Sequence, residues 1–388
     1  MKLSICIITK NEEKNIERCL QSFQKYDFEL VVVDTGSTDQ TKNIAGRYTS
    51  HIYDFEWCDD FAAAKNYAVS KASEEYVMVI DSDEYLNDID IKAVEKLIKE
   101  NPYKVGRIKR INTFVRDGIA YENTEIINRI FSKKLFHYEG KIHEQVSHLK
   151  GKDYETYILP VTIGHSGYDM PEEERKQKAR RNIKLLDLEL KSLINEKIRN
   201  VCNSGQEDTQ KYLEILSETL QREDEFAHSL QQDDRMPYIL YQLGKGYYMA
   251  KEYEKACNYF SLSLSFDLNP KLEYVVDMVE TYGYALINSG QADKAMFFEN
   301  IYDQFGKTAD FKFLMGLIYM ENGLFDKAIE EFKKATQIPD GRMKGVNSYF
   351  ANYNIGVIYE CLGDIQKAKK YYKLCGEYEP AKVRLSAY

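Results

Sequence analysis

A pattern that recurs four times in the C-terminal part of the chain limits the fold more than any other feature. In each copy a glycine is followed twelve residues later by an alanine that a lysine precedes: Gly244 with Lys255-Ala256, Gly283 with Lys294-Ala295, Gly316 with Lys327-Ala328, and Gly356 with Lys367-Ala368. The glycines are 39, 33 and 40 residues apart. Helix pairs of about 34 residues that touch at small side chains are typical of tetratricopeptide repeats. We therefore predict tetratricopeptide-like repeats over residues 236–388.

Residues 1–167 have a different pattern, in which short apolar, β-branched runs alternate with segments of helical periodicity. Runs at residues 3–9, 28–33 and 76–80 are predicted strands, and helices are predicted between them. Strands separated by helices indicate an α/β domain with a mostly parallel sheet covered on both faces.

Between these two parts, residues 168–235 lack any strand signal. The pattern predicts an all-α connector with long polar helices over residues 172–200 and 209–230, separated by a loop at residues 203–206.

Composition excludes several classes of protein. The chain has 388 residues, with 53 Lys and Arg against 62 Asp and Glu, a net charge of −9 and an isoelectric point near 5.4, which argues against nucleic acid as a partner. No apolar run approaches the ~20 residues of a membrane span. The start of the chain lacks a signal-peptide pattern, and the 7 cysteines contain no C-x-x-C pair, so we expect a cytoplasmic protein without disulfides or zinc.

Polar residues follow each of the three predicted strands. They occupy residues 9–12, 34–39 and 81–83. In open parallel sheets, ligands bind beyond the carboxyl ends of the strands. We therefore expect these three clusters to meet in one cleft.

Candidate chemistry in that cleft starts with Asp81 and Asp83. Two carboxylates one residue apart after a buried strand suit Mg²⁺ or Mn²⁺ bound to a diphosphate, although surface loops often carry such pairs. Asp34 is either a turn or helix-capping residue or an acceptor for a base imide. Lys65 is either a solvated charge or the cation that a diphosphate requires.

Together these segments resemble family 2 glycosyltransferases of the GT-A fold. The residues that carry the resemblance are Ser4 to Glu12, Val33 to Asp39, Phe61 to Asn66 and Asp81-Ser82-Asp83. The resemblance implies nucleotide-sugar contacts from Thr9, Asn11, Glu12, Asp34, Lys65, Asp81 and Ser82, and a metal held by Asp81 and Asp83. The chain departs from the family pattern in having Lys65 where arginine is usual, which keeps the charge but loses the bidentate fork, and Thr35 where a second aspartate is usual.

Two later segments extend the resemblance. By analogy with the GT-A fold, Glu144 would be the general base and His165 the third protein ligand of the metal. The residues alone leave His143 and His165 open to an alternative interpretation as packed histidines of the sheet domain.

The order of His143-Glu144, His165, the basic segment at residues 178–182 and the helical repeats is similar to that of the bacteriocin S-glycosyltransferases that make sublancin and thurandacin. That similarity implies a cysteine, or serine, of a ribosomal precursor peptide as acceptor, and a homodimer. Arg180 would contact the diphosphate or lie on a solvated basic helix face.

We therefore expect a metal-dependent, inverting hexosyltransferase with a UDP-sugar donor, a peptide acceptor and Mg²⁺ or Mn²⁺ as cofactor. Two alternatives stay open: a family 2 enzyme that acts on a cell-surface saccharide or lipid-linked acceptor, and a repeat-based scaffold whose nucleotide domain is inactive.

Overall fold

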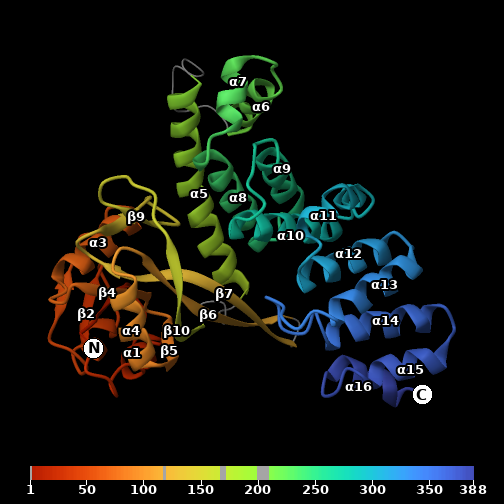
Figure 1. Cartoon of the computed structure of the whole chain (residues 1–388), viewed down its shortest axis with the longest axis horizontal. Helices are drawn as coiled ribbons and strands as arrows, with labels where there is room; N and C mark the ends of the chain where they lie inside the picture. The colour runs from red at the N-terminus through yellow and green to blue at the C-terminus, as the bar shows by residue number, and fades with distance from the viewer. Residues whose placement is uncertain (1, 117–118, 167–171, 199–208) are drawn as a thin grey trace. The chain divides into compact units, whose positions relative to one another are not determined.

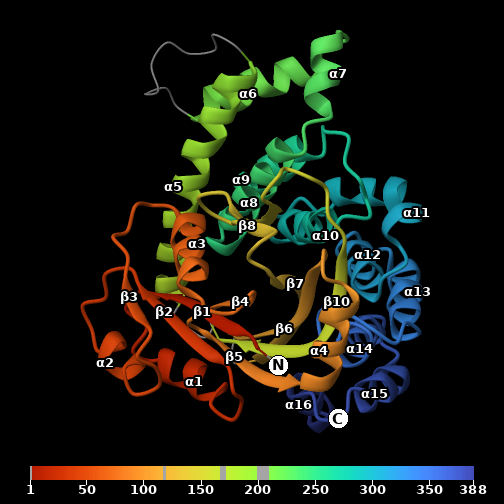
Figure 2. The ribbon, with the colours of Figure 1, turned by 60° about the vertical axis from the view of Figure 1, so that its left-hand side comes forward.

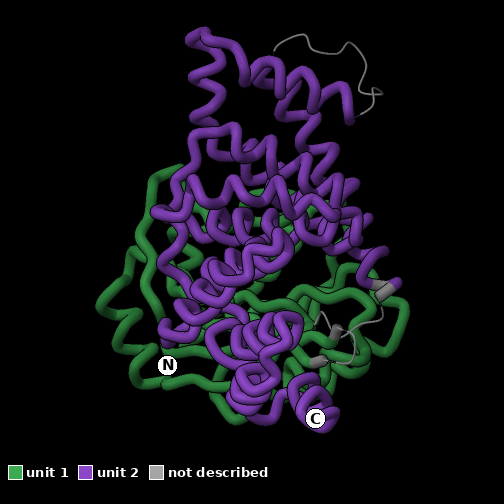
Figure 3. Tube along the Cα trace, turned by 90° about the vertical axis from the view of Figure 1, so that its right-hand side faces the viewer, with its two compact units in different colours: residues 1–170 green, residues 171–388 purple. Residues whose placement is uncertain are grey.

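The computed structural model describes residues 2–116, 119–166, 172–198 and 209–388. It divides into two compact units, residues 1–170 and 171–388 (Figure 3). The predicted domain boundary at 167/168 and the predicted loop at 203–206 lie outside the described residues. The further division of the second unit into a connector and a repeat domain at residue 235 stays a prediction.

The first unit is built on an eight-stranded sheet with the order β3-β2-β1-β4-β7-β6-β10-β5 (Figure 1). Its strands are β1 (Ser4–Thr9), β2 (Glu29–Asp34), β3 (Ile52–Asp54), β4 (Tyr76–Asp81), β5 (Glu84–Ile89), β6 (Val105–Arg116), β7 (Ile119–Ser132) and β10 (Thr156–His165). The pairings from β3 to β4 and between β6 and β10 are parallel, and the other three are antiparallel. The α/β class is confirmed, with a mixed sheet whose parallel part holds the three predicted strands.

Two hydrophobic cores cover the two faces of this sheet. Successive residues of a strand point to opposite faces, so Ile5 and Ile7 of β1 enter one core, whereas Cys6 and Ile8 enter the other. Helices α1 (Ile16–Gln21), α2 (Thr41–Ala45) and α4 (Ile91–Glu100) pack on the first face. Helix α3 (Phe61–Lys71) and a hairpin of β8 (Phe136–Glu139) and β9 (Gln145–His148) pack on the second. Figure 2 shows α3 and α1 on opposite sides of β1 and β2.

The second unit is helical in its described part. It begins with α5 (Glu172–Lys197), α6 (Thr209–Leu220) and α7 (Glu225–Gln231). The prediction of a single helix over residues 209–230 was wrong, because Asp224 interrupts it: its side chain accepts a hydrogen bond from the Ala227 N–H at 2.8 Å and caps a new helix.

Helix pairs follow, as the repeat pattern predicts. They are α8 (Arg235–Met249) with α9 (Tyr253–Ser263), α10 (Glu273–Asn288) with the 3₁₀ helix η1 (Lys294–Ile301) and α11 (Tyr302–Phe305), α12 (Ala309–Glu321) with α13 (Phe325–Thr336), and α14 (Tyr349–Cys361) with α15 (Ile365–Lys373), before a final helix α16 (Glu379–Ser386).

The repeated glycines are the positions at which the two helices of a pair touch. A Cβ atom added to Gly244, Gly316 or Gly356 would lie 2.5–2.6 Å from an aromatic ring sixteen residues later, that of Phe260, Phe332 or Tyr372. Gly283 instead faces Leu314, because the second helix of its pair is the 3₁₀ helix η1. The close contacts explain why glycine recurs at this position.

Within the described ranges, the helices are too short or too polar to span a bilayer. Six cysteines in those ranges are free thiols: Cys6, Cys19, Cys58, Cys257, Cys361 and Cys375.

Candidate active site

The three predicted polar clusters lie at one edge of the sheet, where three adjacent parallel strands end. β1, β2 and β4 end at Thr9, Asp34 and Asp81, and Thr9 pairs with Asp34 while Ile8 pairs with Asp81. From β1 the chain adds β2 and β3 on one side and then β4 on the other. Such a reversal of strand order opens a crevice that binds ligands in α/β proteins.

Thr9 and Asp34 present buried oxygen atoms to this edge. Asp34 is 2% exposed, and its Oδ1 accepts hydrogen bonds from the Gly36 and Ser37 N–H groups at 3.0 and 2.8 Å. Its Oδ2 and the Oγ1 of Thr9 are buried without a hydrogen-bond partner. Buried polar atoms are rarely left unpaired, so these two oxygens suit a polar ligand. A Cβ on Gly36 would meet no atom within 4 Å, so the backbone beside them borders open space.

Asn11 and Glu12 connect the loops that follow β1 and β2. Asn11 has a φ of 55°, and its Oδ1 accepts the Thr38 N–H at 2.8 Å. The Glu12 N–H donates to Thr41 Oγ1 at 2.8 Å, and the Glu12 carboxylate accepts from Asn15 Nδ2 at 2.7 Å. These contacts shape the edge of the crevice around Thr9 and Asp34.

Lys65 links two carboxylates that lie far apart in the sequence. Its Nζ atom lies 2.9 Å from Asp81 Oδ1 and 2.5 Å from Glu144 Oε1, and the residue is only 2% exposed. The interpretation of Lys65 as a solvated charge was therefore wrong. Burial by itself lowers the pKa of a lysine, but Asp81 and Glu144 outweigh it and raise the pKa of Lys65 above its ordinary value.

Arg129 of β7 is a second buried cation, and it is not among the residues predicted from the sequence. Its Nη2 lies 3.1 Å from Asp81 Oδ2 and 3.0 Å from Glu84 Oε1. Burial raises the pKa of Asp81, but Lys65 and Arg129 outweigh that effect and hold it well below its ordinary value. The sequence contained one indication of it, an arginine flanked by apolar residues at 126–127 and 130–131, because a charge in a buried strand requires a partner.

Asp83 and His165 meet because β10 ends beside β5. His165 pairs with Glu84 of β5, and its Nε2 lies 3.4 Å from Asp83 Oδ2. Its Nδ1 lies 2.7 Å from Asn112 Oδ1, and Asn112 Nδ2 donates to Glu125 Oε2 at 3.0 Å. Glu125 thus orients the amide so that its oxygen faces the ring, which favours a proton on Nδ1 and leaves Nε2 as the atom facing Asp83.

This donor set partly fits a divalent cation. A carboxylate oxygen and an imidazole nitrogen whose other ring nitrogen is hydrogen-bonded are suitable ligands for Mn²⁺ or Mg²⁺. In the described part of the chain no three His, Cys, Asp or Glu side chains gather as a metal centre. Asp83 and His165 lie together, whereas both oxygens of Asp81 contact Lys65 and Arg129.

Glu144 is held at the site by the turn between β8 and β9. The Phe61 N–H donates to the carbonyl of Lys141 at 2.8 Å, and the side chain of Asn66 bonds both the N–H and the carbonyl of Tyr138 at 2.8 Å. The pair Lys65-Asn66 therefore positions this turn and contacts its carboxylate. His143, with a φ of 52°, lies in the turn and not in a strand.

The remaining predicted contacts are Ser82 and Arg180. Ser82 is buried between Asp81 and Asp83, whereas Arg180 is exposed on α5 in the second unit. A contact between Arg180 and the nucleotide stays a prediction.

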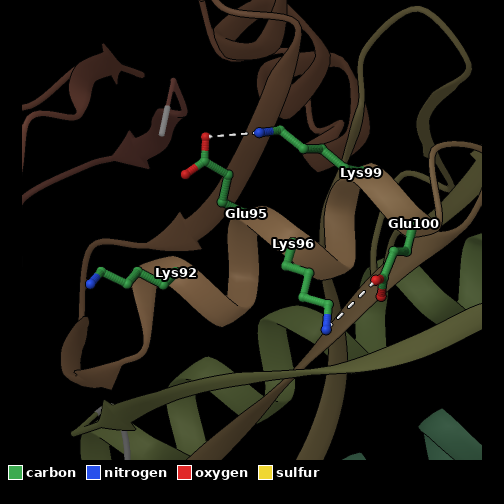
Figure 4. Close-up of a pocket in the computed structure, with 5 residues that line it drawn as sticks. All are labelled: Lys92, Glu95, Lys96, Lys99 and Glu100. Atoms are coloured by element: carbon green, nitrogen blue, oxygen red, sulfur yellow. Dashed lines mark hydrogen bonds and ion pairs between the residues drawn. The ribbon is translucent and has the colours of Figure 1, made fainter.

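A separate hollow lies along α4 (Figure 4). Lys92, Glu95, Lys96, Lys99 and Glu100 line it, with Lys99 and Glu95 paired at 3.4 Å and Lys96 and Glu100 at 3.8 Å. Such exposed pairs contribute little energy, and the hollow contains none of the predicted site residues.

Carboxylates and buried cations at a reversal of strand order are typical of ligand-binding α/β domains, and in this chain helical repeats follow that domain. Residues 4–157 match the family described as glycosyl transferase family 2, and residues 309–340 and 351–382 match the tetratricopeptide repeat. The chain therefore carries a family 2 glycosyltransferase domain of GT-A-like fold and C-terminal tetratricopeptide repeats, as the sequence predicted.

Several known proteins are similar to parts of the chain. The SPbeta prophage-derived glycosyltransferase SunS of Bacillus subtilis is 29% identical over 196 residues, which are 47% of this chain and 43% of SunS. The poly(ribitol-phosphate) beta-N-acetylglucosaminyltransferase TarS of Staphylococcus aureus is 35% identical over 119 residues, 28% of this chain and 21% of TarS. The crystal structure of TarS 1–349 with UDP-GlcNAc has a TM-score of 0.36 at 19% identity, over 79% of this chain and 93% of that one. This chain spans less than half the length of SunS and of full-length TarS.

Proposed function

We propose that this glycosyltransferase moves a sugar, with inversion, from a UDP-sugar to a cysteine or serine side chain of a bacteriocin-type precursor peptide. The observation that carries the proposal is the buried contact of Lys65 with both Asp81 and Glu144 at the switch point. This contact brings Asp81, assigned to the donor diphosphate, and Glu144, assigned to the acceptor, into one cluster.

Thr9 and Asp34 would bind the uracil ring. Asp34 Oδ2, a buried acceptor without a partner, suits the imide N–H, and Thr9 Oγ1 can donate to a neighbouring carbonyl of the base.

Lys65 and Arg129 would stabilise the diphosphate as it leaves. Both cations lie against Asp81, and a diphosphate would compete for them with that carboxylate. A Mg²⁺ or Mn²⁺ ion held by Asp83 and His165, with Asp81 directly or through water, would supply further positive charge to the leaving group.

Glu144 would take the proton of the incoming nucleophile. Its carboxylate is mostly buried and held by Lys65, so its position is fixed before the acceptor arrives. A thiol, with a free pKa of ~8.5, needs this base less than a hydroxyl does.

Similarity to SunS and the helical repeats, which offer an extended surface for a peptide, support the peptide acceptor. Similarity to TarS, a poly(ribitol-phosphate) beta-N-acetylglucosaminyltransferase, supports the second candidate, a cell-surface saccharide acceptor. A cytoplasmic location and a homodimer stay predictions, and the free cysteines fit a reducing compartment.

The decisive experiment offers a panel of UDP-sugars and Mn²⁺ with either a cysteine-bearing precursor peptide or a ribitol-phosphate polymer. Mass spectrometry of the peptide should show the added mass of one sugar, and UDP release should depend on the metal. The Asp83→Asn variant should lose the release, whereas the surface variant Asp54→Asn should keep it. Transfer to the polymer alone would exclude the peptide acceptor, and no UDP release with any donor would favour the scaffold alternative.

A further inference from the structure

The connection between α13 and α14, residues 337–348, returns to an earlier helix of the repeats. The carboxylate of Asp310, in the first turn of α12, accepts the Arg342 and Met343 N–H groups, each at 2.8 Å. Asn347 Nδ2 closes the connection by donating to the carbonyls of Ile338 and Pro339 at 2.9 and 2.8 Å. Asp310 thus holds this segment through two successive backbone N–H groups.

The guanidinium of Arg342 lies against α10. It bonds Glu280 Oε2, and its Nη2 lies 3.3 Å from Asp277 Oδ1. Asp277 Oδ2 also accepts from Tyr241 Oη at 2.6 Å and from Lys245 Nζ at 2.9 Å, both on α8. Residues from the first helices of three successive pairs, α8, α10 and α12, therefore meet at this place. We call Asp277, Glu280 and Asp310 the acidic cluster.

The acidic cluster is not fully satisfied by Arg342. Glu280 is 5% exposed, and its Oε1 has no hydrogen-bond partner, nor does the buried Nε of Arg342. The Arg342 side chain is 36% exposed, so solvent reaches it. Lys245 of α8 pairs with Asp277, whereas Arg342 of the connecting loop pairs with both Asp277 and Glu280. The ion pair of Glu280 therefore comes from a connecting loop and not from a neighbouring helix.

We propose that the acidic cluster is a binding site for an arginine within an extended peptide, and that Arg342 occupies this site in cis until such a peptide displaces it. The contacts of Arg342 define the chemistry of the ligand. Asp277 and Glu280 would bind the planar guanidinium of the peptide's arginine, and Asp310 would accept two successive backbone N–H groups. A lysine lacks the fork that contacts two carboxylates at once. The site lies in the repeats and goes beyond the sugar transfer proposed for the first unit.

The test measures fluorescence anisotropy of a labelled peptide with the sequence of residues 337–348 and of the same peptide with glutamine for arginine. The full-length Arg342→Ala variant should bind the arginine peptide at least ten-fold more tightly than the wild-type chain, because no cis competitor remains. Adding Glu280→Gln and Asp277→Asn should abolish that binding. Arg384→Ala, which removes an arginine paired with Glu360 at 2.8 Å in the last repeat, is the matched control and should bind like wild type.

Equal binding of the two peptides, or no binding to a folded Arg342→Ala variant, would overturn the proposal. If that variant does not fold, hydrogen exchange of the wild-type chain decides. About 1 mM unlabelled arginine peptide should speed exchange of the Arg342 and Met343 amides, and the glutamine peptide should not. Unchanged exchange with both peptides would show that the connection is a fixed part of the repeat fold.

Discussion

At the scale of single residues, the site combines the buried cations Lys65 and Arg129 with carboxylates that lie far from them in the chain, of which Asp81 is 37% exposed. Lys65 contacts Asp81 and Glu144, and Asp81 also contacts Arg129. Removing one member of such a set leaves another charge buried and unpaired, which typically costs about 3–5 kcal/mol. The cluster therefore constrains which substitutions can test function without unfolding the domain.

Asp34→Asn is one substitution that meets this condition. Asparagine keeps an Oδ1 that accepts the Gly36 and Ser37 N–H groups, and the Oδ2 it replaces has no partner. We expect little change in the free energy of unfolding but a roughly 10- to 100-fold weaker binding of UDP, since a hydrogen bond to a charged group contributes about 1.5–3 kcal/mol. Calorimetric titration with UDP checks this result. Asp39→Asn is the control in the same loop, and unchanged UDP affinity of Asp34→Asn would exclude the base contact.

Glu144→Gln tests the general base. The amide still accepts from Lys65 but cannot take a proton, so transfer to a serine peptide should fall by about 10²–10⁴-fold. Transfer to the cysteine peptide should fall far less, because a thiol ionises more easily. Initial rates with the two peptides measure the difference, with Glu139→Gln on the same hairpin as the control. Equal losses for both acceptors would argue against this role.

At the scale of elements, close helix contacts explain the repeats. Gly316→Ala adds a methyl group that would lie 2.6 Å from Phe332. Helix propensity favours alanine by about 1 kcal/mol, but overpacking costs about 1–3 kcal/mol, so we expect a net loss of stability in urea unfolding. The substitution Phe332→Leu should lower the free energy of unfolding less in the Gly316→Ala variant than in the wild-type chain. A higher free energy of unfolding for Gly316→Ala would contradict this expectation, because it would mean that the Phe332 ring can move away from the added methyl group.

Glu280 on α10 predicts a pH dependence of stability. Burial raises the pKa of Glu280 to about 8, against an ordinary 4.5, although Arg342 opposes the shift. Between these values the folded state binds more protons than the unfolded state, so stability falls as pH rises, by up to about 1.4 kcal/mol per pH unit. Glu280→Gln removes this dependence, and its stability relative to wild type should rise from about pH 5 to pH 8. If the free energies of unfolding of Glu280→Gln and wild type differ by the same amount at every pH, the pKa of Glu280 is not raised. The substitution Glu330→Gln at an exposed position is the control.

At the scale of the whole molecule, the excess of acidic residues argues against binding of nucleic acid but not against binding of a single nucleotide. With a net charge of −9, we expect no retardation of a DNA duplex at about 50 mM salt, whereas UDP still binds. Local cations at Lys65 and Arg129 would suffice for the proposed diphosphate, but a duplex requires a broad basic surface. Gel shift and UDP titration on the same sample measure both. Salt-sensitive DNA binding would contradict this expectation.

Local patterns predicted much of this architecture. Apolar runs ending in polar clusters indicated β1, β2 and β4, because a buried parallel strand must be apolar along its length and can change character only at its end. The glycine pattern indicated the helix pairs for a similar reason, since only a small residue permits the close contact. The long antiparallel pairing of β6 with β7 was not predicted, because it depends on partners and not on a local period.

The sequence by itself determined the α/β domain, the helical repeats and the acidic residues at the strand ends. Only the tertiary structure revealed that Lys65 joins Asp81 to Glu144, that Arg129 and Asn112 belong to the site, and that Arg342 occupies the acidic cluster. The physical reason is burial. From the sequence alone, a charged side chain is expected to be exposed to solvent. When it is buried, a partner must compensate its loss of hydration. That partner lies far away in the sequence and is brought close by the strand order or by a connecting loop.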